Sequence, residues 1–248
     1  MLRNLPPVTK NLLILNVMFY VVSMILASNG IDMNQKLGSH YFNSILFEPY
    51  QIVTHMFMHS LTDFFHILFN MMLLVMFGAH LERIWGAKRY FIFYVACGLG
   101  ALVLYNSIGV WQIMELKKQL IADGFDITVL NNKMLSGPFQ FAINSDQSEY
   151  LVNSYVGMNY STIAGASGAI FGLLAGFAML FPNTPLQLLF IPVPIKAKYL
   201  IGGYLAFEVY NSIFKQGGDI AHLAHVGGAI VGIVFILVWR KTDRNNFY

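Results

Sequence analysis

Ser167 and His225 are the two side chains whose types and positions best suit chemistry. Ser167 lies among the small residues Gly165, Ala166 and Gly168 at the start of an apolar stretch, and His225 lies in another such stretch. A serine hydroxyl becomes a nucleophile when a neighbouring imidazole takes its proton, and histidine suits this task because its pKa is near neutral. The two residues therefore predict a serine nucleophile with a histidine base, placed where the sequence otherwise suits lipid.

A third apolar stretch supplies hydrogen-bond donors for the same reaction. His66 and Asn70 are four residues apart, so both face one side of a helix. Attack of serine on a peptide carbonyl creates an oxyanion, which backbone N–H groups at a helix start and polar side chains stabilise. We expect His66, Asn70 and the backbone N–H of Ser167 to do this. Asp219 is the sole acidic residue near His225 in sequence, so a Ser-His pair is favoured over a triad.

Glycines repeat every four residues beside both candidate catalytic residues. They are Gly168, Gly172 and Gly176 in the serine stretch and Gly228 and Gly232 in the histidine stretch. In lipid, stripes of small residues allow helix backbones to approach closely. A serine hydroxyl needs this close approach to reach a histidine on another helix, so the stripes are expected to bring the two helices together.

Composition indicates a membrane protein with several spans. Hydrophobic residues make up 56% of the 248 residues and charged residues 11%, against roughly 25% charged in an average soluble domain. A helix needs about 20 apolar residues to cross a bilayer core. Six stretches approach this length: 11–28, 64–81, 89–110, 162–181, 199–214 and 221–239. We expect an all-α membrane protein, a six-transmembrane-helix bundle forming a single membrane domain over residues 1–248.

The positive charges predict the orientation of the bundle, because cytoplasmic loops are rich in Lys and Arg. With the N-terminus inside, the inner segments hold Arg3, Lys10, Arg83, Lys88, Arg89, Lys196, Lys198, Arg240, Lys241 and Arg244. The outer segments hold Lys36, Lys117, Lys118, Lys133 and Lys215. Both termini are therefore expected to be cytoplasmic. The net charge of +3 then reflects topology rather than affinity for nucleic acid.

The connections between the predicted spans differ in character. Residues 29–63 form a long outer connection that is apolar in patches, and 111–161 form an elaborated outer loop whose first part has the spacing of an interfacial helix. Four prolines punctuate the inner loop 182–198. Glu208 in the fifth span is costly against lipid, so we expect it to face a cavity or to extend to the surface. That span and the loop 214–219 are the predicted mobile gate.

The motifs, in this order, resemble those of the rhomboid family of six-helix intramembrane serine proteases. Residues 165–168 match the family's GxSG motif, 66–70 match its HxxxN motif, and 224–232 match its AHxxGxxxG motif. Glu82 and Gly86 also fit the family pattern. The resemblance covers residues 11–239 apart from 111–161.

The resemblance implies roles for individual residues. Ser167 and His225 would be catalytic, His66 and Asn70 would stabilise the oxyanion, and Phe171 would pack on the catalytic imidazole. The chain departs from the pattern in its first outer loop, where some relatives carry Trp-Arg and this chain carries Tyr50-Gln51. The anchoring of that loop is therefore expected to differ, and the role of the long 111–161 insert is open.

The implied activity is endopeptidase cleavage of transmembrane segments near the outer face, with no cofactor and no metal. The partners would be transmembrane protein substrates and the lipid bilayer, with no nucleic acid. We expect no leading presequence, and together with a cytoplasmic N-terminus this expectation favours the inner membrane of a bacterium. We expect a hydrophilic cavity lined by Ser167, His66, Asn70 and His225, because hydrolysis needs water.

Three alternatives stay open. A catalytically silent rhomboid-like protein would bind membrane helices without cutting them, although it would not need all four polar residues. A transporter or channel would be expected to show internal repeats, and the sequence shows none. His55, His59, His66, His222 and His225 offer a metal site, against which stands the absence of a carboxylate accompanying them on a span.

Overall fold

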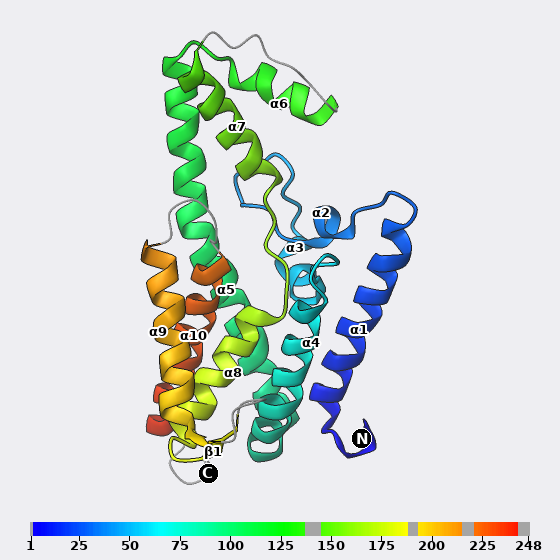
Figure 1. The fold of residues 1–248 in the computed structure, drawn as a ribbon, viewed down its shortest axis with the longest axis vertical. Helices are drawn as coiled ribbons and strands as arrows, with labels where there is room; N and C mark the ends of the chain where they lie inside the picture. The colour runs from blue at the N-terminus through cyan, green and yellow to red at the C-terminus, as the bar shows by residue number, and fades with distance from the viewer. Residues whose placement is uncertain (1, 137–144, 188–192, 215–220, 243–248) are drawn as a thin grey trace.

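The protein is described by a computed structural model that covers residues 2–136, 145–187, 193–214 and 221–242. The described chain is mostly helical (Figure 1). The main helices are α1 (Pro7–Ala27), α4 (Phe64–Leu73), α5 (Ala79–Ala122), α8 (Ser167–Leu180), α9 (Ala197–Phe214) and α10 (Ala221–Thr242). Shorter helical elements are η1 (Leu2–Asn4), α2 (Met33–Leu37), α3 (Gln51–Thr54), η2 (His55–Phe57), α6 (Ile127–Ser136) and α7 (Asp146–Tyr160). A π-helical turn, η3 (Leu74–Gly78), joins α4 to α5.

Each of the six predicted apolar stretches lies on helix over most of its length. By length and composition, three helical segments of the described chain can cross a membrane: Pro7–Ala27, Phe64–Ala122 and His222–Thr242. The second of these holds two predicted stretches, 64–81 and 89–110. The helical geometry breaks between them at Gly86, where φ is +77°. Ser167–Leu180 is a shorter apolar helix. The chain therefore has the helices of a membrane protein.

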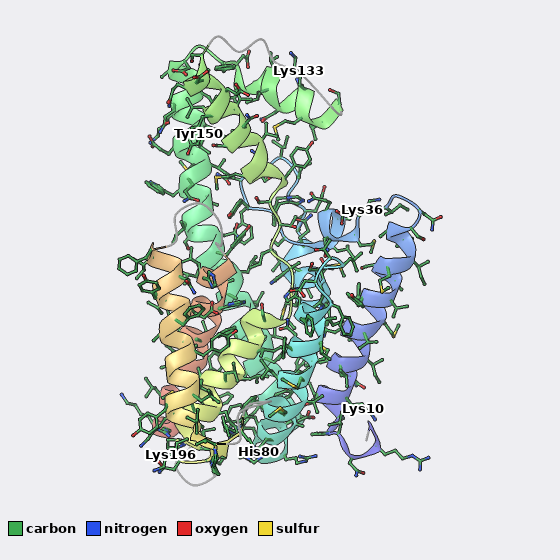
Figure 2. All side chains as sticks on the ribbon, viewed as in Figure 1. Lys10, Lys36, His80, Lys133, Tyr150 and Lys196 are labelled. Carbon is green, nitrogen blue, oxygen red and sulfur yellow. The ribbon has the colours of Figure 1, made fainter. Side chains whose placement is uncertain are left out.

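Three of the lysines used to predict the orientation lie at the two ends of the molecule, and a fourth lies between them. Figure 2 shows Lys10 and Lys196, both assigned to inner segments, at the same end as His80. Lys133, assigned to an outer segment, lies at the opposite end. The first outer connection, with Lys36, lies between these extremes.

Two element boundaries differ from the predictions. The fourth helix starts at Ser167 rather than near residue 162, because residues 161–166 are not helical and Ile163 pairs with Ser39 as an isolated bridge. The third helix continues to Ala122, so the predicted interfacial helix after residue 111 is the C-terminal end of α5. In the inner loop, β1 (Pro185–Leu186) pairs with β2 (Ile195–Lys196), a small addition to the expected all-α fold.

The described parts of the predicted outer loop 111–161 are helical and share an apolar core with the bundle. α6 and α7 lie beside the C-terminal end of α5, above the other helices in Figure 1. Their buried side chains form one cluster with residues of α5 and with Tyr41: Ile113, Leu120, Leu130, Met134, Leu151, Val152 and Tyr155. These helices are therefore packed onto the bundle rather than free.

Gln51 anchors the first outer connection. Its side chain is buried, its carbonyl oxygen accepts from the backbone N–H groups of His40 and Glu48, and its amide donates to the carbonyls of Lys36 and Leu46. Tyr50 beside it is exposed. The buried Gln51 amide thus ties together four backbone positions of this connection.

Glu82 holds the start of α1 against α5. Its carboxylate is buried and accepts hydrogen bonds from the backbone N–H groups of Val8 and Thr9 and from the Thr9 hydroxyl, at 2.7 to 2.8 Å. The first N–H groups of a helix have no partner within the helix, and its positive dipole end favours an anion. A buried carboxylate thus caps a helix far away in sequence.

His55 and His59 are buried histidines of the first outer connection. Burial lowers the pKa of each from 6.5 to about 4, and repulsion from His66 contributes for His59. Below pH 6.5 the unfolded chain therefore binds more protons than the folded chain, so stability falls as the pH falls. The loss between pH 7 and pH 5 is about 2 kcal/mol for each histidine.

Replacing His55 by Asn should remove its share of this pH dependence. The His55 Nδ1 atom bonds to the carbonyl of Gln51 one turn earlier, at 2.9 Å, and an Asn can make the same type of bond, as Asn70 does to His66. We expect unfolding in detergent at pH 7 and pH 5 to show a free-energy loss smaller by about 2 kcal/mol in the variant. An unchanged difference between the two pH values would contradict this assignment.

Candidate active site

The turn before α8 places Ser167 by means of backbone contacts to the first outer connection. The N–H of Gly165 donates to the carbonyl of His55 at 2.8 Å, and Ile163 exchanges two hydrogen bonds with Ser39. Gly165 has a φ of +131°, a conformation that residues with a Cβ rarely adopt. A Cβ there would also lie 3.1 Å from His66 Nε2. The glycine therefore permits both the turn and the close approach of His66.

Ser167 and His225 meet as the sequence predicted. The Oγ atom of Ser167, the first residue of α8, lies 2.9 Å from Nε2 of His225, near the start of α10. This is hydrogen-bond distance for a hydroxyl that donates to an unprotonated imidazole nitrogen. The pair therefore has the geometry of a nucleophile and its base.

The glycine stripes bring these two helices together. A Cβ added to Gly228 would overlap the carbonyl of Gly168, and one added to Gly232 would lie 2.8 Å from the carbonyl oxygen of Gly172. Real Cβ atoms essentially never come within 3.0 Å of a heavy atom from another part of the chain. On the other side of α8, a Cβ on Gly168 or Gly172 would overlap side chains of α5. Backbone contact between α8 and α10 is therefore what sets the distance between serine and histidine.

Phe171 fixes the plane of the His225 ring. The two rings stack with centroids 4.2 Å apart and an interplanar angle of 12°. Tyr204 of α9 packs against Phe171 in turn, at 5.0 Å between centroids. Phe171 thus lies where the sequence resemblance placed it, on the imidazole.

Glu208 is the residue of this site that sequence reasoning missed. Its Oε2 atom lies 2.8 Å from Nδ1 of His225 and 2.6 Å from Nδ1 of His222. The expected pair without an acidic neighbour is therefore wrong in geometry, because a carboxylate reaches His225 from another helix. The available signal was a lone acidic residue in an apolar stretch, which was expected to face a cavity or the surface. Instead the Glu208 side chain is buried, with 3% of its surface exposed, and it contacts the two histidines.

His66 presents a protonated ring nitrogen toward the serine. The backbone N–H of Ser60 donates to His66 Nδ1 at 3.3 Å, so Nδ1 carries no proton and the neutral ring holds its proton on Nε2. That nitrogen faces the turn at Gly165, beside Ser167. Asn70, one turn on, donates one amide hydrogen to the carbonyl of His66 at 2.7 Å, which fixes the amide and leaves its second hydrogen.

Two cavities meet at these residues. The larger, about 620 Å³, is lined by Ser167, His66 and His225 together with residues of the outer connections, and Asn70 is absent from its lining. The smaller, about 320 Å³, runs between α4 and α9 and is lined by all four predicted residues, with Phe171 and Tyr204. The four residues predicted to line one cavity therefore share the smaller one, and three of them also line the larger. The predicted gating loop 214–219 lies outside the described residues after Phe214.

The histidines do not gather as a five-member metal site. Within the described residues, three groups able to hold a metal lie close together, with ligand atoms within 4.8 Å: Glu208, His222 and His225. The sequence argument that no carboxylate accompanies the histidines is wrong for this cluster. His55 instead bonds to the backbone of its own loop, and His59 packs against His66.

Comparison with known proteins places the chain in a family. The Rhomboid domain profile matches residues 46–113 and 130–242, which is most of the chain. The chain is also similar to "Rhomboid protein 1, mitochondrial" of Saccharomyces cerevisiae, with 34% identity over 71 residues. That match covers 29% of this chain and 20% of the yeast protein, so the chain spans about a fifth of its relative's length. The profile, matched on both sides of the serine turn and through the histidine helix, shows that this chain belongs to the rhomboid family.

Proposed function

We propose that this protein is an intramembrane serine endopeptidase that cleaves transmembrane segments near the outer face of a membrane. The observation that carries the proposal is the 2.9 Å contact between Ser167 Oγ and His225 Nε2 beside a cavity. Family membership suggests either such a protease or an inactive relative and does not decide between them. A silent relative would need neither the hydroxyl–imidazole contact nor the donors that face it.

The reaction follows from the positions of the two side chains. Ser167 Oγ attacks the carbonyl carbon of the substrate, its proton moves to His225 Nε2, and the carbonyl π electrons move to oxygen. The C–N bond then breaks, and the proton on Nε2 goes to the leaving nitrogen. Water attacks the acyl-enzyme in the same way, giving its proton to His225, which returns one to Ser167 when the C–Oγ bond breaks.

Asn70 and His66 are suited to stabilise the oxyanion of this reaction. Both line the smaller cavity beside Ser167, and each has an N–H that its other hydrogen bonds leave available. Donors fixed before the reaction stabilise developing charge without reorganisation.

Replacing Asn70 by Ala should therefore lower kcat by about 10² to 10³-fold, the usual loss for one oxyanion donor, with little change in KM. Cleavage of a transmembrane reporter over a range of substrate concentrations measures both constants. Asn106 makes the same type of bond to the carbonyl four residues earlier on α5 and lies outside both cavities. An Asn106→Ala control with an equal loss of kcat would argue against a role of Asn70 at the oxyanion.

The short α8 explains how water would reach a serine inside a membrane. Its 14 residues span about 21 Å, less than the roughly 30 Å hydrocarbon core. Ser167 at its outer end would then lie below the outer surface, reached through the larger cavity. In this arrangement the chain has six spans with both termini in the cytoplasm, and we propose the inner membrane of a bacterium as its location.

Substrates are expected to be membrane helices that unwind locally. A helix hides its carbonyls in its own hydrogen bonds, so small or helix-weakening residues near the outer boundary favour attack. The smaller cavity between α4 and α9 is the proposed lateral entry. A cross-link between α4 and α9 that leaves cleavage intact would remove this entry route.

The proposal is tested by cleavage of a reporter transmembrane segment by purified protein in liposomes. Wild type should release two fragments, and Ser167→Ala should release none. If folded wild type leaves a broad panel of transmembrane segments intact, the hypothesis of a catalytically silent rhomboid-like protein replaces the protease proposal.

A further inference from the structure

Glu208 contacts the candidate base from a helix that the mechanism above does not use. Its Oε2 atom lies 2.8 Å from His225 Nδ1, while the other ring nitrogen lies 2.9 Å from Ser167 Oγ. An ionised carboxylate only accepts hydrogen bonds, so Nδ1 carries the proton. Nε2 of the neutral ring is then unprotonated and faces the serine hydroxyl, which is the tautomer that a base requires.

We propose that Glu208 is a positioning residue for His225, so that serine, histidine and glutamate act as a three-membered relay of hydrogen bonds. The inference rests on the proposed function and deepens it, because it concerns how the same base is held. Glu208 does not touch the reacting atoms. It selects the imidazole tautomer and stabilises the imidazolium formed when Ser167 loses its proton, as the acid does in serine hydrolases of other folds.

The placement of Glu208 supports this role over a simple clamp between helices. A buried carboxylate on an apolar helix is costly, and two histidine N–H groups that point at one oxygen offset that cost. The same helix fixes a second side of the ring, because Tyr204, one turn earlier, packs on Phe171, which stacks on His225. The imidazole is thus held on its face, its Nδ1 edge and its Nε2 edge.

The distances favour hydrogen bonds over a metal at the same residues. Zinc binds nitrogen and oxygen at about 2.0 to 2.1 Å in tetrahedral geometry, which separates two ligand atoms by about 3.3 Å. The N–O separations of 2.6 and 2.8 Å are shorter. A metal on His225 Nδ1 would also displace the proton on which the relay depends.

The test uses the reaction of Ser167 with a phosphonofluoridate, which needs no membrane substrate. The Oγ–P bond forms, fluoride leaves with the P–F electrons, and the serine proton passes to His225. We expect Glu208→Gln to lower the second-order rate constant by at least about 10²-fold, because its amide can offer a donor to Nδ1 and favour the wrong tautomer. Glu208→Asp keeps a carboxylate and should recover part of the rate.

A spectroscopic readout separates positioning from packing. In protein labelled with ¹⁵N-histidine, His225 Nδ1–H should give a strongly downfield proton resonance that disappears in His225→Ala and in Glu208→Gln. Asn211→Ala, a buried polar position one turn further along α9, should keep both the resonance and the rate within about threefold. This control shows what a general disturbance of α9 does.

The outcomes distinguish this inference from the proposed function. If wild type reacts and Glu208→Gln reacts equally fast, the relay is wrong while the protease proposal stands. If wild type does not react although the resonance is present and lost in Glu208→Gln, the positioning contact stands and the protease proposal fails. A rate that chelation abolishes and zinc restores would overturn the relay in favour of a metal at the three residues.

Discussion

Replacing His225 by Ala is expected to lower kcat/KM for a transmembrane reporter by at least about 10³-fold. His225 Nε2 is the basic atom at hydrogen-bond distance from Ser167 Oγ, so the variant leaves the hydroxyl with no group to take its proton. The same nitrogen must protonate the leaving amine and later take a proton from the attacking water, so acylation and deacylation are both slowed. Initial rates at several reporter concentrations in liposomes measure the change, which should appear in kcat.

Two comparisons make this prediction specific to the base. His222→Ala removes a second histidine of α10 that contacts Glu208 without touching Ser167, so its loss should be much smaller. Combining Ser167→Ala with His225→Ala should cost little more than either change alone, because residues that act as a unit are not additive. Losses that multiply would show that the two side chains act independently, contrary to the proposed mechanism.

Replacing Gly228 by Val should have the second largest effect, although the residue carries no functional group. A Cβ at this position overlaps the carbonyl of Gly168, so α8 and α10 must separate. Ser167 is one residue before Gly168, and His225 is three residues before Gly228. Separating the helices would therefore break the contact between Ser167 and His225. A misplacement of 1 Å costs about 10²-fold in rate, and overpacking costs about 1–3 kcal/mol of stability.

The control for this prediction is Gly202→Val on α9. A Cβ at Gly202 meets no atom within 4 Å, so the same change of residue creates no overlap. Cleavage rate and thermal unfolding in detergent should both stay near wild type in the control and fall in Gly228→Val. A fully active and stable Gly228→Val protein would show that backbone contact does not set the position of the pair.

The residues of the site that lie on regular helices could be predicted from sequence. A spacing of four residues places His66 beside Asn70 and aligns the glycines within α8 and within α10, because residues four apart share a helix face. The approach of the two helices follows from what small residues permit in lipid. Such patterns are local, so one sequence is enough to recognise them.

The features that sequence reasoning missed depend on contacts between distant segments. Glu208 reaches His225 through the packing of α9 on α10, and no spacing within either helix encodes that contact. The start of α8 is set by the bridge of Ile163 to Ser39, in a stretch whose composition alone suits a longer helix. The C-terminal extension of α5 is likewise stabilised by α6 and α7, which bury one of its faces.

The central claim is that Ser167 is a nucleophile activated by His225. The most direct measurement is mass spectrometry of the protein after reaction with a phosphonofluoridate, with the modified residue located by peptide fragmentation. We expect a single adduct on Ser167 in wild type, none in Ser167→Ala and almost none in His225→Ala. Folded wild type without an adduct, or with an equal adduct in His225→Ala, would contradict the claim.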